Sequence, residues 1–82
     1  MIYFVYILKS KVARKSYVGI TDNLERRIEE HNRGKNFYTS RYLPWELVYN
    51  EKFLNREEAR NREKYFKSAA GRRFLKKFVF RN

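Results

Sequence analysis

The segment Ile2–Leu8 constrains the fold of this chain more than any other, because all seven of its residues are aliphatic or aromatic. Polar and apolar positions do not alternate along it, which is typical of a strand that is covered on both faces. We therefore expect this strand in the middle of a small sheet. A chain of 82 residues has room for a single domain with a thin core. We predict that residues 1–82 form one domain built from one compact pair of α and β layers.

Two further segments predict strands. Ser16–Ile20 combines aromatic and β-branched residues, and the polar segment before it predicts a turn, so the first two strands should form a hairpin. Trp45–Tyr49 follows Pro44 and has the composition of a third strand.

The first predicted helix covers residues 23–33. Asp22 followed three residues later by Glu25 resembles a capping box, and Gly34 provides a stop signal. A helical period of 100° per residue places three side chains on one stripe: Leu24, Ile28 and His31. Arg27 lies on the flank of this stripe, at the boundary of the core.

A second helix should begin at Asn55, which forms a capping box with Glu58, and should run to about Ala70 before Gly71 interrupts it. One face of this helix carries Ala59, Phe66 and Ala70, with Glu63 among them. The segment 72–80 predicts a last amphipathic helix, so the order of elements is ββαβαα.

The charge balance points to a polyanionic partner. The chain has 20 Lys and Arg residues against 9 Asp and Glu residues, a formal net charge of +11. DNA, RNA and an anionic membrane surface all fit this charge. A membrane fits least well, because no predicted helix combines a broad apolar face with a uniformly basic one.

Composition also excludes several classes of site. There is no cysteine and only one histidine, so we expect neither disulfides nor a structural zinc site, and a bound metal would be a hard ion held by oxygen. The chain has no P-loop, no GxGxxG motif and no Ser/His/Asp signature. Its longest apolar run is far shorter than the roughly 20 residues of a membrane span, and we see no signal peptide, so we predict a cytoplasmic protein.

Glu63 is the most unusual placement, because a carboxylate on an apolar helix face needs a partner or a cation. One interpretation is an ion pair with Lys67, four residues later, or with an arginine from the first helix. The other is a ligand for Mg²⁺, which proteins often hold with one or two carboxylates and several waters.

Arg27 and His31 are separated by one helical turn and present two potential phosphate donors side by side. Each also has a structural interpretation, as an arginine whose stem covers apolar surface and as a hydrogen-bonded core histidine. Tyr6 and Tyr17 lie within the first two strands, where tyrosine is common. Because the ordinary pKa of tyrosine is about 10, a tyrosine base would need a nearby cation or base.

The loop 35–43 mixes basic and aromatic residues, which could stack on bases while cations contact phosphates. It could equally be a solvated loop anchored by its aromatic rings. Our candidates for nucleic-acid binding are Lys35, Tyr38, Arg41 and, from the second helix, Lys67.

Taken together, these residues resemble the GIY-YIG nuclease superfamily, especially its small stand-alone bacterial members. The first motif appears as Phe4-Val5-Tyr6, with Phe4 where the family name has glycine, and the second as Tyr17-Val18-Gly19. The signature arginine and histidine match Arg27 and His31, and the helix carboxylate matches Glu63. The resemblance covers essentially the whole chain.

The resemblance implies an α/β fold of the α+β type, with a three-stranded antiparallel sheet flanked by helices. It also implies an endonuclease that hydrolyses phosphodiester bonds in DNA, whether branched, nicked or single-stranded. By this analogy Glu63 holds one Mg²⁺ or Mn²⁺, Tyr6 orients or deprotonates the attacking water, and Arg27 neutralises developing charge. Tyr17 and His31 would support the water network and the tyrosine.

Two alternatives remain open at this stage. The first is a weak or inactive module that kept the nuclease fold and only binds nucleic acid. The second is a basic accessory protein on RNA or on a ribonucleoprotein. We expect DNA as a partner in preference to RNA.

Overall fold

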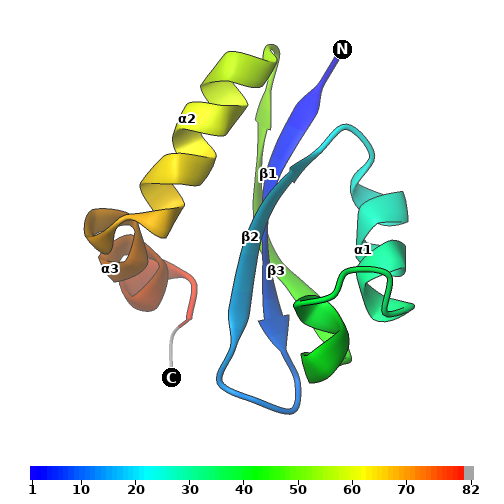
Figure 1. The fold of residues 1–82 in the computed structure, drawn as a ribbon. Helices are drawn as coiled ribbons and strands as arrows, with labels where there is room; N and C mark the ends of the chain where they lie inside the picture. The colour runs from blue at the N-terminus through cyan, green and yellow to red at the C-terminus, as the bar shows by residue number, and fades with distance from the viewer. Residues whose placement is uncertain (81–82) are drawn as a thin grey trace.

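The computed structural model describes residues 1–80 and contains a three-stranded antiparallel sheet with helices on both of its faces (Figure 1). The strands are β1 (Tyr3–Ser10), β2 (Ser16–Thr21) and β3 (Trp45–Phe53), and the helices are α1 (Leu24–Asn32), α2 (Arg56–Lys67) and α3 (Ala69–Phe78). A short 3₁₀ helix, Thr39–Tyr42, lies between α1 and β3. The predicted antiparallel sheet and the order ββαβαα are confirmed.

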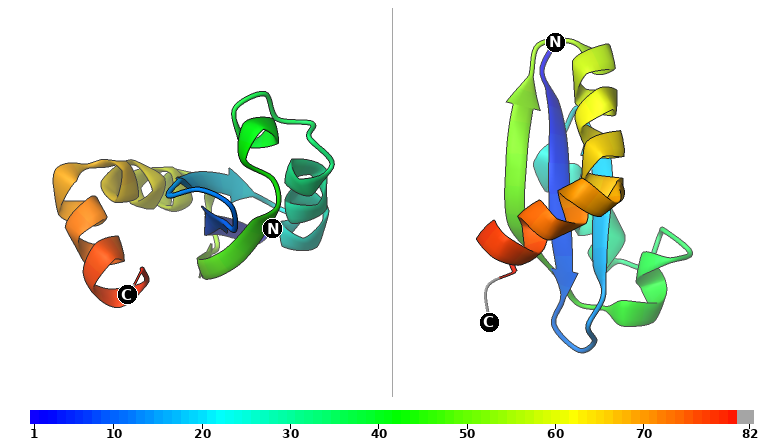
Figure 2. Two further views of the ribbon diagram at one scale, coloured as in Figure 1. Left: turned by 90° about the horizontal axis from the view of Figure 1, so that it is seen from below. Right: turned by 90° about the vertical axis from the view of Figure 1, so that its left-hand side faces the viewer.

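Strand β1 lies in the centre of the sheet, between β2 and β3, as its apolar sequence predicts. Val5 and Ile7 point to one face and pack in a core with residues of α2 and α3, whereas Tyr6 and Leu8 point to the other face and pack toward α1. The expected single pair of layers is therefore wrong. Burying both faces of β1 requires helices on both sides, and the sheet is the middle of three layers (Figure 2).

Helix α1 begins one residue later than the capping pattern predicts. The Oδ1 atom of Asn23 accepts a hydrogen bond from the backbone N–H of Arg26, so Asn23 is the cap rather than Asp22. Asp22 instead accepts a hydrogen bond from the Arg26 guanidinium at 3.5 Å. Gly34 ends the turn after α1 with a φ of +78°, a conformation that glycine adopts without strain.

The break between α2 and α3 also differs from the prediction. Helix α2 ends at Lys67, and Ser68 has an extended backbone between the two helices. Its Oγ caps α3 by accepting a hydrogen bond from the N–H of Gly71. Gly71 does not interrupt a helix but lies buried in the first turn of α3, where a Cβ would collide with the backbone of Tyr65. Ala70, expected on the buried face of α2, belongs to α3 and is exposed to solvent.

The predicted loop 35–43 contains the 3₁₀ helix and is anchored to the rest of the fold. Thr39, the first residue of that helix, is fully buried. The side-chain amide of Asn32, at the end of α1, hydrogen-bonds both the N–H and the C=O of Trp45, at the start of β3. The loop is thus fixed between α1 and β3. Within residues 1–80, none of the helices is long and apolar enough to cross a membrane.

Candidate active site

Tyr6 is the residue around which the candidate site is built. It lies opposite Gly19 in the register of β1 and β2, and its ring passes over Gly19 toward the outer edge of the sheet. A Cβ at Gly19 would lie 2.5 Å from the Tyr6 hydroxyl and 2.6 Å from its Cζ atom. Gly19 is therefore required by the close approach of the ring, and it allows a residue of the central strand to reach the edge strand β2.

The Tyr6 hydroxyl belongs to a buried chain of hydrogen bonds. It lies 2.8 Å from His31 Nε2, and His31 Nδ1 lies 2.8 Å from Thr39 Oγ1. The Arg27 Nε–H donates to the Tyr6 oxygen at 3.4 Å. Because Tyr6 accepts from Arg27, its own proton is free to point to His31. The Thr39 hydroxyl can in turn donate to the backbone oxygen of Asn36, at 3.5 Å.

Burial shifts the pKa values of Tyr6 and His31 in opposite directions. It raises the pKa of Tyr6 to about 12, against a smaller lowering by the Arg27 hydrogen bond. Burial, followed by the positive charge of Arg27, lowers the pKa of His31 to about 4. At neutral pH the proton therefore remains on Tyr6, and His31 is neutral. The partners then assign its tautomer: Nε2 accepts from Tyr6 and the Nδ1–H donates to Thr39.

Arg27 is held at the rim of the site by two partners. Besides the bond to Tyr6, its Nη1 donates to Glu30 Oε1 at 3.1 Å. Burial opposes the charged form of Arg27, but these two hydrogen bonds outweigh it and raise the pKa of the guanidinium. With its side chain about one-third exposed, Arg27 presents a permanent positive charge to a ligand.

Glu63 faces the same space from α2. Its Oε2 accepts a hydrogen bond from Lys67 at 3.2 Å, so the ion pair considered from the sequence is present. The carboxylate is not sealed, however, because its side chain is 21% exposed. It opens on a cavity of about 240 Å³. This cavity is lined by Tyr6, Tyr17, Gly19, Ile20, Arg27, Arg56, Arg60 and Glu63.

The donor set suits a hard, mostly hydrated cation better than a fully caged one. Among residues 1–80, no three His, Cys, Asp or Glu side chains gather closely enough to form a metal cage. Mg²⁺ needs no such cage, since it is often held by one or two carboxylates together with waters and substrate phosphates. The single carboxylate of Glu63 fits that mode of binding.

Sequence comparison relates this geometry to known proteins. The model of the GIY-YIG catalytic domain matches residues 2–77. The chain belongs to the GIY-YIG family. This is a nuclease-type family, and the resemblance seen in the sequence is thereby confirmed.

Individual relatives of this GIY-YIG domain are small proteins of similar length. The chain is 49% identical over 65 residues to a UPF0213 protein of Clostridium perfringens, covering 78% of this chain and 69% of the relative. It is 41% identical over 75 residues to a UPF0213 protein of Staphylococcus haemolyticus, covering 90% of each. The solution NMR structure of a UPF0213 protein from Bacillus halodurans is 36% identical, with a TM-score of 0.56, and the match covers 92% of this chain and 82% of that one.

The GIY-YIG domain brings together most of the side chains selected from its sequence. Four of them line the same cavity: Tyr6, Tyr17, Arg27 and Glu63. His31 lies one hydrogen bond behind this cavity, fully buried. The four candidates for nucleic-acid binding divide into two groups. Tyr38 and Lys67 line a larger groove next to the cavity, whereas Lys35 and Arg41 line neither space.

Several residues of the candidate site were not selected from the sequence. Arg56 and Arg60 lie on α2 in the two turns before Glu63, so helical periodicity could have placed them beside it. Gly19 was noted only as part of a motif, and its contact with Tyr6 depends on strand register. Thr39 has no signal in the sequence, because its contact with His31 depends on the path of the intervening loop.

Proposed function

We propose that this protein is a divalent-metal-dependent endonuclease that hydrolyses phosphodiester bonds in DNA. The observation that carries this proposal is the convergence of Tyr6, Arg27 and Glu63 on one solvent-accessible cavity at the free edge of β2. Their chemistry is complementary: a cation, a carboxylate and a hydrogen-bonded hydroxyl surround a space that a phosphate can enter. Membership of the GIY-YIG family supports the same reaction class.

In this proposal Tyr6 positions the water that attacks phosphorus. With a pKa of about 12, the Tyr6 hydroxyl keeps its proton and donates a hydrogen bond to His31, so its oxygen can accept a hydrogen bond from a water in the cavity. Of the two roles implied by the family, orientation of water thus fits the resting site better than deprotonation. Tyr17 lines the cavity beside Tyr6, where its ring and hydroxyl can limit the positions of that water.

Charge stabilisation comes from both helix layers. Arg27, held in place by Tyr6 and Glu30, faces the oxygens on which negative charge grows during phosphoryl transfer. Arg56 and Arg60 add two exposed cations on the α2 side, suited to holding the phosphate. Glu63 would hold Mg²⁺ or Mn²⁺, which supplies further positive charge to the phosphate oxygens.

A cleavage assay tests this proposal. Branched, nicked and single-stranded DNA are incubated with the protein in Mg²⁺ or Mn²⁺, and products are followed on denaturing gels. We expect Arg27→Ala and Glu63→Gln each to lower the rate roughly 10²- to 10³-fold, the usual effect of removing one group that stabilises a transition state.

Two matched variants serve as controls. Arg26→Ala removes the neighbouring arginine, which is exposed, and Glu57→Gln neutralises an exposed carboxylate on the same helix as Glu63. Both should cleave like the unmodified protein. Cleavage that survives Arg27→Ala and Glu63→Gln unchanged would show that the activity belongs to a contaminant.

One contact favours a second candidate function, a module that binds nucleic acid without cutting it. The Lys67 ammonium already occupies Oε2 of Glu63, and a cation must compete with it for that oxygen. The formal net charge of +11 would support binding in either case. This alternative predicts salt-dependent binding of DNA with no product in any divalent metal.

A further inference from the structure

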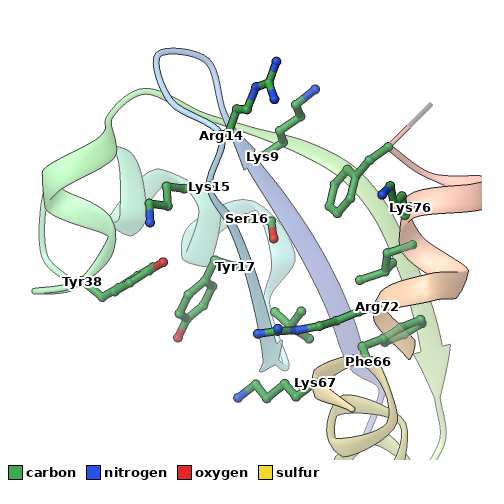
Figure 3. Close-up of a pocket in the computed structure, with 13 residues that line it drawn as sticks. Lys9, Arg14, Lys15, Ser16, Tyr17, Tyr38, Phe66, Lys67, Arg72 and Lys76 are labelled. Carbon is green, nitrogen blue, oxygen red and sulfur yellow. The ribbon is translucent and has the colours of Figure 1, made fainter. Parts of the chain in front are cut away.

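A second and larger cavity lies next to the candidate active site. It is a groove of about 950 Å³ between β2 and the 3₁₀ region on one side and the end of α2 with α3 on the other (Figure 3). Of the residues that the structure describes, six with cationic side chains line it: Lys9, Arg14, Lys15, Lys67, Arg72 and Lys76. We refer to this space as the basic groove. Nothing in the proposed chemistry uses it.

The charge of the basic groove is almost entirely uncompensated. Among residues 1–80, no carboxylate side chain lines it. Lys67 is paired with Glu63, but within residues 1–80 the other five cations form no ion pair. Like charges gathered in a concave surface focus a positive potential, so the groove is suited to a polyanion.

The floor of the groove indicates which polyanion fits. Between the cations lie apolar side chains, among them Val18, Phe66 and Leu75. The rings of Tyr17 and Tyr38 form one wall, with centroids 6.2 Å apart and planes inclined by 31°. A duplex keeps its bases stacked inside and would leave these rings and this floor without partners. Unpaired bases can stack on aromatic rings while cations follow the phosphates, which is the usual mode of single-strand binding.

The basic groove and the active-site cavity adjoin each other. Tyr17 lines both spaces, and Lys67, in the groove, hydrogen-bonds Glu63, in the cavity. A strand that lies in the groove therefore leads directly to the carboxylate and to Arg27.

We infer that the basic groove binds single-stranded nucleic acid on one side of the bond to be cut, so that the protein acts on unpaired segments or beside them. The guidance of a strand to the site rests on the proposed nuclease function, whereas the binding does not. The groove recognises unpaired bases on a phosphate backbone, and this chemistry is common to DNA and RNA.

Binding is measured by fluorescence anisotropy with the unmodified protein in EDTA, because removal of divalent metal stops the proposed cutting and leaves the ion pair between Lys67 and Glu63 in place. The probes are a labelled DNA single strand, the same sequence as a duplex, and the same sequence as RNA, with poly-glutamate as a competitor. We expect the single strands to bind more tightly than the duplex and to resist displacement by poly-glutamate.

Variants locate the binding. Tyr38→Ala should weaken single-strand binding roughly 5- to 150-fold because a stacking partner is removed, and Tyr38→Phe should retain it. Lys15→Ala combined with Arg72→Ala should lower the slope of log K against log salt by about 1.4, or about 0.7 for each phosphate that the protein no longer neutralises. Arg33→Ala combined with Lys52→Ala removes the same charge from exposed positions outside the groove and should leave the slope nearly unchanged.

The inference is overturned if the duplex binds as tightly as the single strand, if poly-glutamate displaces the strand at equal charge, or if both double variants have the same effect. A cleavage assay with metal separates the two proposals. Single-strand binding that maps to the groove without any cleavage would reject the nuclease and leave the groove assignment standing. Cleavage that the groove variants do not change would reject the guidance of the strand.

Discussion

Replacing Gly19 with alanine tests the central contact of the site. The added Cβ would lie 2.5 Å from the Tyr6 hydroxyl and within 2.9 Å of two further ring atoms. Carbon contacts in proteins are ordinary from about 3.4 Å, so the ring or strand β2 must move by about 0.9 Å. The ring cannot move freely, because it is 1% exposed and bonded to His31 and Arg27.

The expected magnitude follows from that displacement. Overpacking a buried site by one methyl group costs about 1–3 kcal/mol. For a domain of this size each kcal/mol lowers the melting temperature by about 4–8 °C, so a loss of about 2 kcal/mol lowers it by about 8–16 °C. A displacement near 1 Å in a catalytic group can also reduce a rate roughly 10²-fold. Thermal unfolding measures the first effect, and metal-dependent DNA cleavage measures the second.

A double-mutant cycle decides whether Tyr6 is the cause. Leucine at position 6 ends before the ring atoms that the new Cβ would meet. The destabilisation by Gly19→Ala should therefore fall from about 2 kcal/mol to below about 0.5 kcal/mol in the Tyr6→Leu background, giving a coupling of about 1.5 kcal/mol. An equal destabilisation in both backgrounds would refute this reasoning, because the glycine would then be needed for some reason other than the ring.

Three further predictions concern the candidate site and the residues that support it. Because the pKa of buried His31 is about 4 and that of an unfolded histidine about 6.5, the unfolded chain binds more protons between these values, and stability should fall with decreasing pH. The free energy of unfolding, measured with urea, should fall by about 2 kcal/mol between pH 7 and pH 5 and by about 3 kcal/mol in total. This pH dependence should be flatter in the His31→Asn variant. Thr39→Val should leave the His31 Nδ1–H unpaired and destabilise the fold by about 1–3 kcal/mol, whereas Thr39→Ser should not. Equal stability of the two variants would show that the hydrogen bond between His31 and Thr39 does not stabilise the fold. Lys67→Gln should strengthen Mn²⁺ binding, measured by electron paramagnetic resonance, because it removes the ammonium that is paired with Glu63. Lys64→Gln changes an exposed lysine on the same helix and should leave the affinity for Mn²⁺ unchanged. Unchanged affinity in both variants would mean that Lys67 does not compete with the metal for Glu63.

Local signals in the sequence predicted the elements of the fold well. The lack of alternation in Ile2–Leu8 reflects Val5 and Ile7 on one face of β1 and Tyr6 and Leu8 on the other. The asparagine cap of α2 and the stop at Gly34 were also readable, because both depend on neighbouring residues alone.

Features that depend on distant contacts were missed. Gly71 suggested a helix break by composition, but its actual constraint is the backbone of Tyr65, which only the packed corner between α2 and α3 reveals. The number of layers was underestimated for a similar reason. A strand with two apolar faces requires two covering layers, yet the short length of the chain suggested one.

The candidate site was predictable mainly through the family resemblance. Helical periodicity placed Arg27 and His31 together, but nothing in the spacing of Tyr6 and Glu63 shows that they share a cavity. That proximity exists because Tyr6 reaches across Gly19 to the edge where α2 presents Glu63. Thr39 could not have been found, since a threonine in a polar loop is ordinary until the loop is folded.

The position of the cavity at a free strand edge has a consequence for how a polymer enters it. Within residues 1–80, strand β2 pairs only with β1, so the space on its outer side is approached laterally rather than through a tunnel. A long chain can settle there by any internal stretch without threading an end. For a substrate this means that a closed circle, which offers no terminus at all, is as accessible as a linear molecule.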